Sequence, residues 1–257
     1  MKYSQNIGNR KFQEDGFFCG KLNYFKIIGI IDGHGGELLM KIIKKNYINI
    51  LKSYLENNNI ILEKNNFIET IKNFYLYLDN YFINKKIKSG CCISVIFYNY
   101  KEKYINIVQL GDTKILILDN KFNYKYETTE HRLINSEVNR ILKLEGSKNI
   151  YKHKNIKRYK TLMISRVFGD YEYKNLDKSR EEDPLSSIPD IISITYDKKL
   201  YGIFITDGVY DLINTDNIVK LAKRNKFNIL HKVIMNECLE HKYKRKDNIT
   251  VIIEEFI

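Results

Sequence analysis

The stretch KIIGIIDGHGG, residues 26–36, joins an apolar run to a group of glycines. Its first six residues are rich in isoleucine and predict a buried β-strand. The strand is predicted to end at Asp32, because the segment DGHGG cannot continue a regular strand. A carboxylate placed where an apolar strand meets the edge of the core is costly unless a positive charge meets it. Asp32 is therefore the first candidate for a functional side chain.

Three further aspartates lie at similar positions along the chain. Asp112 follows the run YINIVQL and a glycine, Asp207 follows YGIFIT, and Asp247 directly precedes NITVII. A single aspartate at a strand end often only caps a turn. Four such residues in one chain indicate a shared function.

Carboxylates of this kind are suited to binding hard cations. Mg²⁺ and Mn²⁺ select oxygen ligands, typically a few carboxylates, a backbone carbonyl and water. Asp32 and Asp207 are each followed by a glycine, whose bare backbone can approach an ion closely. Zinc is not expected, because the sequence contains no cysteine–histidine cluster.

The spacing of apolar residues predicts helices and strands that are grouped in blocks. Two long helices are predicted over residues 37–55 and 67–82, and their aromatic stripes are expected to face the core. Strand-like runs at 91–100, 104–110 and 114–118 follow with short turns, which predicts antiparallel hairpins. The other predicted elements are helices at 136–144, 216–224 and 229–240 and strands at 162–164, 201–206 and 249–256. This grouping indicates a layered α+β sandwich.

The composition fits one compact domain over residues 1–257. Hydrophobic residues make up 44% of the chain, enough for a sizeable core, and no glycine- or serine-rich linker marks a boundary. The net charge is +12, but abundant Lys, Asn, Ile, Tyr and Phe beside a single alanine, Ala222, are typical of an AT-rich coding sequence. Nucleic acid is therefore not expected as a partner, and the basic runs at residues 151–160 and 241–246 are interpreted as solvated loops.

The cysteines and the N-terminal residues indicate a soluble, reduced protein. Cys19, Cys91, Cys92 and Cys238 form no C-x-x-C pair, and the adjacent Cys91 and Cys92 are poorly placed for a disulfide. The first residues lack the apolar core of a signal peptide, and no run approaches the roughly 18 apolar residues of a membrane span. We expect a monomer in the cytoplasm or the nucleus.

The chain resembles the protein phosphatase 2C family along nearly its whole length, and its motifs follow in the order that is usual in the family. Each motif is weak alone, but the ordered set is specific. The motifs are GNRKFQED at 8–15, DGHGG at 32–36, SGC at 89–91, GDTK at 111–114, EHR at 130–132, SRVFGD at 165–170, PD at 189–190, TDGVYD at 206–211 and DNIT at 247–250. Glu130, Arg132 and Tyr210 differ from the residues that are more usual in the family, and Glu130 and His131 are interpreted as structural.

The resemblance implies a four-layer α-β-β-α sandwich of two packed antiparallel sheets flanked by helices. It also implies two Mg²⁺ or Mn²⁺ ions that activate a water for attack on phosphorus, without a covalent phospho-enzyme. The implied metal residues are Asp32, the carbonyl of Gly33, Asp207 and Asp247 as ligands, Glu14 for a metal-bound water, Asp15 as support for the ligands, Asp112 with Asp211 for a weaker third ion, and Asn248 as a brace. Arg10 would grip the phosphoryl oxygens, and His34 would protonate the departing alkoxide.

Phosphoserine and phosphothreonine proteins are the substrates that the resemblance implies. One alternative is a catalytically weak or inactive member that binds phosphoproteins as a scaffold, and the intact Asp32, Asp207 and Asp247 argue against it. A second is a two-metal hydrolase of nucleotides or nucleic acid, which the net charge of +12 keeps open. A generic binding module with an aromatic platform is a third, and no specific residue supports it.

Overall fold

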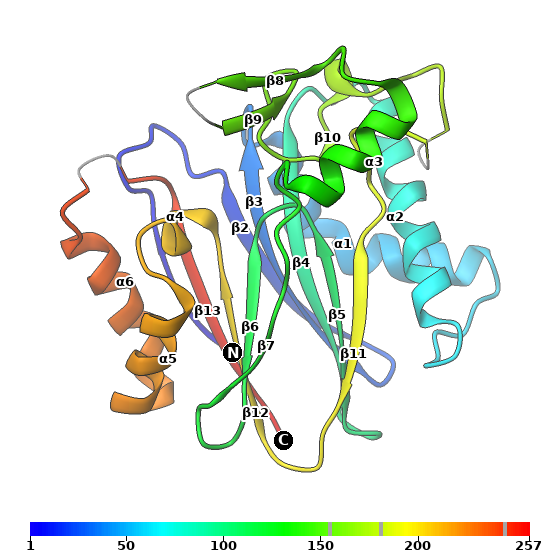
Figure 1. Cartoon of the computed structure of the whole chain (residues 1–257). Helices are drawn as coiled ribbons and strands as arrows, with labels where there is room; N and C mark the ends of the chain where they lie inside the picture. The colour runs from blue at the N-terminus through cyan, green and yellow to red at the C-terminus, as the bar shows by residue number, and fades with distance from the viewer. Residues whose placement is uncertain (154–155, 180–181, 244–245) are drawn as a thin grey trace.

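The computed structural model describes residues 1–153, 156–179, 182–243 and 246–257. Within these residues, two antiparallel sheets pack face to face and helices cover both outer faces, as Figure 1 shows. The expected α+β class and the four-layer α-β-β-α order are thereby confirmed. Parts of the two basic runs, residues 154–155 and 244–245, lie outside the described residues.

The first sheet pairs the two ends of the chain. Its strand order is β1-β13-β12-β6-β7, and Asn6 at the end of β1 lies opposite Ile249 at the start of β13. This pairing brings the segment after β1 beside the segment before β13. In chain order the strands are β1 (Lys2–Asn6), β6 (Lys114–Leu118), β7 (Tyr124–Glu127), β12 (Leu200–Ile205) and β13 (Ile249–Phe256).

The second sheet contains residues 26–34 of the stretch KIIGIIDGHGG in an interior strand, β3. Its order is β11-β5-β4-β3-β2, and the short β10 also pairs with β4. The strands are β2 (Asp15–Leu22), β3 (Phe25–His34), β4 (Gly90–Asn99), β5 (Tyr104–Leu110), β10 (Phe168–Gly169) and β11 (Asp190–Thr195). A separate hairpin of β8 (Ile150–His153) and β9 (Ile156–Tyr159) lies with helix α3 (Asn135–Glu145) at the upper end of the sandwich in Figure 1.

The five helices predicted from apolar spacing are all confirmed, with ends that differ by at most two residues. Besides α3 they are α1 (Leu38–Asn57) and α2 (Phe67–Asn84) over the second sheet, and α5 (Thr215–Arg224) and α6 (Leu230–Glu240) over the first. One short helix, α4 (Asp207–Tyr210), directly follows β12, and two 3₁₀ turns occupy Tyr171–Tyr173 and Phe227–Ile229. None of the described helices has the length and apolar character needed to cross a membrane.

The isoleucines of β3 are buried on both faces of the sheet. Ile28 and Ile30 point into the core between the sheets, whereas Ile27 and Ile31 pack in the cluster beneath the helices α1 and α2. Alternate residues of a strand point to opposite faces, so a strand with both faces covered needs a continuous apolar run. This requirement explains the sequence KIIGII.

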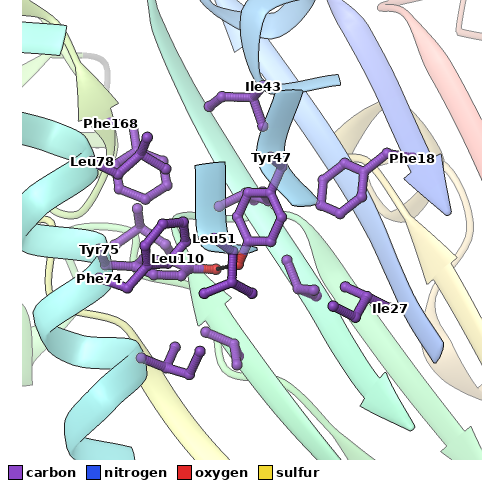
Figure 2. Close-up of a cluster of buried hydrophobic side chains, with 14 of the residues drawn as sticks. Phe18, Ile27, Ile43, Tyr47, Leu51, Phe74, Tyr75, Leu78, Leu110 and Phe168 are labelled. Carbon is purple, nitrogen blue, oxygen red and sulfur yellow. Dashed lines mark hydrogen bonds between the residues drawn. The ribbon is translucent and has the colours of Figure 1, made fainter. Parts of the chain in front are cut away.

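Aromatic side chains fill the outer core, as expected from the two helical stripes (Figure 2). Tyr47 from α1 and Phe74 and Tyr75 from α2 are buried there, and Phe18 of β2 stacks on Tyr47 with 4.6 Å between ring centroids. The hydroxyl of Tyr47 donates to that of Tyr75 over 3.3 Å, so both buried polar groups have a partner. The interpretation of these stripes as core is confirmed.

Strand β3 continues further than predicted. It does not end at Asp32 but runs to His34, with Asp32, Gly33 and His34 opposite Cys92, Cys91 and Gly90 of β4. The prediction was wrong because the hydrogen bonds of the β4 ladder maintain the strand through glycines that disfavour it in isolation. As a result, Asp32 and His34 are held by a sheet and not by a loop.

The predicted hairpin between 104–110 and 114–118 is also wrong. Strand β5 belongs to the second sheet and β6 to the first, so Gly111-Asp112-Thr113 crosses from one sheet to the other. Gly111 adopts φ +94°, a conformation that side-chain-bearing residues rarely take. The crossing places Asp112 between the sheets, at their common end.

Residues 162–164 do not form the predicted strand. Leu162 and Ile164 make only isolated bridges, to Tyr159 and Arg132. In the described chain, the backbone hydrogen bonds of this segment go to different neighbours and do not form a continuous ladder with one strand. For example, the carbonyl of Met163 accepts from the amide of Leu133 over 3.1 Å. The segment instead lines a cavity that also contains Asp32 and Asp207.

Candidate active site

The four strand-end aspartates converge at one end of the sandwich. Asp32 comes from β3 and Asp112 from the crossing after β5, while Asp207 and Asp247 flank β12 and β13 of the other sheet. A cavity of about 240 Å³ lies there. It is lined by Arg10, Asp32, Gly33, His34, Cys92, Asp112, Arg158, Thr161, Leu162, Met163, Ile164, Asp207 and Asp247. Seven of the eleven predicted site residues are therefore at one cavity, and Glu14, Asp15, Asp211 and Asn248 lie behind or beside them.

Asp32 has an unsatisfied oxygen. Its Oδ2 is buried and has no hydrogen-bond partner among the described residues. Burial, together with the charges of Asp207, Asp15 and Asp112, raises the pKa of Asp32 well above its ordinary value. An unpartnered buried carboxylate oxygen is costly, so this position favours a positive ligand.

The pKa values of Asp15 and Asp207 are raised in the same way. Asp15 lies opposite Asp32 in the pairing of β2 with β3, and its Oδ2 accepts from the hydroxyls of Thr206 (2.9 Å) and Thr250 (2.7 Å). Burial raises the pKa of Asp15 to about 7 although both threonines lower it. Burial and the charges of neighbouring aspartates raise the pKa of Asp207 to about 8. Ionisation of these side chains is thus disfavoured unless cations are present.

The donor set fits hard divalent cations. It consists of carboxylate and carbonyl oxygens, which Mg²⁺ and Mn²⁺ prefer, and it includes the unpartnered Asp32 oxygen. In the described part of the chain, no three or more Asp, Glu, His or Cys side chains are grouped so that they alone could hold one ion. An ion bound here would therefore complete its coordination with a backbone carbonyl, such as that of Gly33, and with water.

Asn248 ties the segment after β1 to the site. Its Oδ1 accepts from the amide of Glu14 (2.7 Å), and its Nδ2 donates to the carbonyls of Ile7 (2.9 Å) and Phe12 (3.1 Å). A Cβ on Gly8 would lie 2.1 Å from the carbonyl oxygen of Asp247, so this contact requires glycine. The segment that carries Arg10 and Glu14 is thereby held against the start of β13.

Arg10 and Glu14 have partners within the site. The guanidinium of Arg10 pairs with the carboxylate of Asp247, and its side chain is 52% exposed. The Oε1 of Glu14 accepts from the amide of Gly36 over 2.6 Å, which links the segment to the glycines after β3. Arg10 therefore faces the cavity with an accessible, planar cation.

His34 is paired with Asp170, a residue that the sequence reasoning did not place in the site. Its Nε2 lies 2.8 Å from Asp170 Oδ2. Burial lowers the pKa of His34, but the hydrogen bond and charge of Asp170 raise it overall. A Cβ on Gly90, opposite His34 in the sheet, would lie 2.4 Å from both paired atoms. Glycine at position 90 therefore leaves the space in which the pair forms.

Other cavity residues were also missed. Arg158 and Thr161 line the cavity, although residue 158 lies in a basic run that was interpreted as a solvated loop. Asp170 belongs to the motif SRVFGD, so the sequence contained the residue in a recognised motif, but no role was predicted for it.

Glu130 and His131 make the structural contacts that were expected of them. Glu130 pairs with Lys114 (3.0 Å) and with Arg132 (3.3 Å). His131 is buried, and its Nδ1 accepts from the amide of Gly111 (3.0 Å).

Cys92 lines the cavity as a buried thiol. Burial and the charges of Asp112 and Asp32 raise its pKa well above the ordinary value. All four cysteines are free. A thiol that resists ionisation is a poor nucleophile, in agreement with chemistry that needs no covalent intermediate.

The raised pKa values predict how the metal-free protein responds to pH. Asp15 and Asp207 stay protonated up to about pH 7 and about pH 8, against an ordinary pKa of 3.8. The folded state then binds more protons than the unfolded state, so the free energy of unfolding falls as pH rises between these limits. In EDTA we expect the Tm to fall from about pH 5 to about pH 8, and Mn²⁺ to restore it most at the upper end. A Tm in EDTA that rises across this range contradicts the assignment.

Comparison with known proteins agrees with this arrangement. Residues 1–249 match the family model described as protein phosphatase 2C. Protein phosphatase 2C homolog 2 of Saccharomyces cerevisiae is 27% identical over 218 residues, which cover 78% of this chain and 42% of that protein. Protein phosphatase 1L of Bos taurus is 24% identical over 263 residues, covering 97% of this chain and 70% of that one. The chain thus spans less than half the length of the yeast relative.

The fold has close counterparts among solved structures. The crystal structure of a phosphatase from a pathogenic strain of Toxoplasma gondii superimposes with a TM-score of 0.83 at 16% identity. The match covers 98% of this chain and 90% of that one. At this level of identity the likeness concerns the fold.

Proposed function

This chain belongs to the protein phosphatase 2C family, and we propose that it hydrolyses phosphoserine and phosphothreonine in proteins with the help of two divalent cations, Mg²⁺ or Mn²⁺. One observation carries the proposal. The buried Asp32 Oδ2, which has no hydrogen-bond partner within the described ranges, lies among further acidic groups whose pKa values are raised, in a cavity that also presents Arg10 and His34.

The cations would be held by the oxygen atoms at the common end of the two sheets. Asp32, the carbonyl of Gly33, Asp207 and Asp247 are the proposed ligands, with Glu14 directed at a bound water. Asp15 supports Asp32 from behind, in the position of a group that orients a ligand. When bound, Mg²⁺ or Mn²⁺ supplies an activated water and charge stabilisation for a reaction that is otherwise extremely slow.

Arg10 is proposed to bind the phosphoryl group. Its guanidinium can donate two parallel hydrogen bonds to phosphoryl oxygens. Its present partner, Asp247, is a proposed metal ligand, so the guanidinium of Arg10 would be free to bind substrate if Asp247 held a cation. This exchange couples phosphate binding to the presence of metal.

His34 is proposed as the general acid. Asp170 occupies Nε2 and favours the protonated ring, which leaves Nδ1 to donate a proton to the leaving serine or threonine oxygen. An alkoxide is a poor leaving group, and protonation at the moment of cleavage removes that obstacle. The strand position of His34 keeps the ring at a fixed place beside Asp32.

The test is a comparison of substrates at saturating Mn²⁺. We expect turnover of phosphothreonine and phosphoserine peptides, slower turnover of the matched phosphotyrosine peptide, and none of a nucleoside triphosphate or single-stranded DNA. Faster hydrolysis of nucleotide or DNA supports the nucleic-acid alternative. A folded protein that binds Mn²⁺ but releases no phosphate from any peptide supports the scaffold alternative.

A further inference from the structure

Arg132 places its guanidinium beside Asp112 and Asp207, two of the acidic residues that line the cavity. It follows His131, whose buried ring and backbone are bound to the start of the crossing segment at Gly111. The Arg132 side chain is 29% exposed, so most of it is covered by protein. The sequence motif EHR did not reveal this placement.

Four carboxylates surround the guanidinium. Its Nε lies 3.3 Å from Asp112 Oδ2 and 3.3 Å from Glu130 Oε2. Its Nη2 lies 3.4 Å from Asp211 Oδ1 and 3.8 Å from Asp207 Oδ2. The guanidinium thus contacts Asp112 and Asp211, which were expected to hold a weaker third ion. It also contacts Asp207, a proposed ligand of the two main ions.

Tyr210 holds the guanidinium in this position. Arg132 Nη2 donates to the Tyr210 hydroxyl over 2.9 Å, and that hydroxyl donates to the carbonyl of Asp112 over 2.8 Å. The Arg132 Cζ also lies 5.2 Å from the centre of the Tyr210 ring, within the range of a cation–π contact. Lys114 lies 4.8 Å from the same ring and pairs with Glu130, so a second cation adds to the local positive charge.

We propose that Arg132 is a built-in cation that takes the place of a third metal ion between Asp112 and Asp211, so that this chain binds two divalent cations and not three. The proposal rests on the proposed function, because it concerns the same metal centre. A divalent ion entering this position would have to displace a guanidinium that already has four acidic partners and a hydroxyl acceptor. It would also meet two fixed positive charges, which disfavours its entry.

This arrangement makes Arg132 a positioning residue. Through Nη2 it reaches Asp207, and through Nε it holds Asp112. Unlike an exchangeable ion, a side chain keeps these carboxylates in place at any metal concentration. Activity should therefore saturate when the two main sites fill, with no further rise at higher metal concentration.

The experiment counts Mn²⁺ ions bound at saturation, by titration calorimetry checked with elemental analysis after equilibrium dialysis. Wild type should bind two ions. Arg132→Gln, which keeps the length but removes the charge, should bind a third, weaker ion, whereas Arg132→Lys should stay at two. Arg224→Gln, which removes an exposed charge from the last turn of α5, is the matched control and should also stay at two.

A second measurement, the Tm, gives a readout that is independent of the ion count. In EDTA, Arg132→Gln should lower the Tm by several degrees and Arg132→Lys by less, because unshielded carboxylates repel. If the glutamine variant does not fold, Asp211→Asn decides: its ion count should remain two, whereas a true third site at Asp211 would lose an ion.

The outcomes separate the two proposals. Three ions in wild type, or two in folded Arg132→Gln with an unchanged Tm, overturn the role of Arg132 and leave the phosphatase proposal intact. A wild type that binds fewer than two ions contradicts the metal centre itself, and the role of Arg132 fails with it.

Discussion

Asp32→Asn is expected to reduce kcat on a phosphothreonine peptide by roughly 10³-fold or more, because a ligand shared by the metal centre supplies several kcal/mol of charge stabilisation. The same change should raise the Tm of the protein in EDTA. The reason is that an amide replaces a buried carboxylate whose Oδ2 lacks a hydrogen-bond partner in the described part of the chain and whose ionisation is opposed by four neighbouring acids.

A lower kcat together with a higher Tm in EDTA distinguishes a functional residue from a structural one. A structural aspartate would lose stability on substitution, whereas Asp32 is expected to gain stability without metal and lose the Tm increase that Mn²⁺ gives. Steady-state kinetics and thermal unfolding with and without Mn²⁺ measure both. Asp216→Asn, on the exposed first turn of α5, provides the matched control and should change neither. A lower Tm in EDTA for Asp32→Asn, or activity within about tenfold of wild type, contradicts the assignment.

His34→Gln should lower kcat on a phosphothreonine peptide by about 10²-fold, the usual contribution of a positioned general acid. The loss should be much smaller with para-nitrophenyl phosphate, because nitrophenolate leaves without a proton. The comparison of the two substrates in one variant isolates proton donation from any general disturbance of the cavity. Equal losses on both substrates would show that His34 acts in another way.

Asp170→Asn tests the same pair through the pH profile. Asp170 raises the pKa of His34, and the acid must be protonated to act. Without that charge, the fall in activity at high pH should move to lower pH. A stabilising role for Asp170 alone would lower activity without moving the profile.

Much of the fold could be predicted from local patterns because those patterns follow directly from burial. The run KIIGII is apolar at every position except its first residue and its glycine, and the structure buries both faces of that strand. The helical stripes of α1 and α2 likewise pack as expected. The wrong predictions concern features that depend on residues distant in the sequence. An example is the continuation of β3 to His34, which pairs with Gly90 of β4.

Two strands whose bounds were not predicted, β1 and β11, share a physical reason. Strand β1 has the sequence KYSQN, which is polar, and its burial pattern is mostly exposed or intermediate. It exists because β13 offers a hydrogen-bonding edge from the other end of the chain. Strand β11 depends in the same way on β5. Such pairing energy is invisible in a local window of sequence.

The site was predicted in its composition but not in its geometry. Strand-end positions singled out Asp32, Asp112, Asp207 and Asp247, and only the resemblance to a family joined them to Arg10, Glu14 and His34. The short crossing at Gly111 was interpreted as a hairpin, although it carries Asp112 from one sheet to the other. The position of Arg132 among four carboxylates depends on side-chain placement and has no signature in sequence spacing.

The most direct test of a metal-dependent phosphoprotein phosphatase at this cavity is phosphate release from a phosphothreonine peptide by wild type and Asp207→Asn, each with Mn²⁺ and with EDTA. We expect release by wild type with Mn²⁺, none in EDTA, recovery when Mn²⁺ is restored, and almost none by Asp207→Asn under any condition. Release that persists in EDTA, or that survives in Asp207→Asn at a rate near that of wild type, would contradict the account.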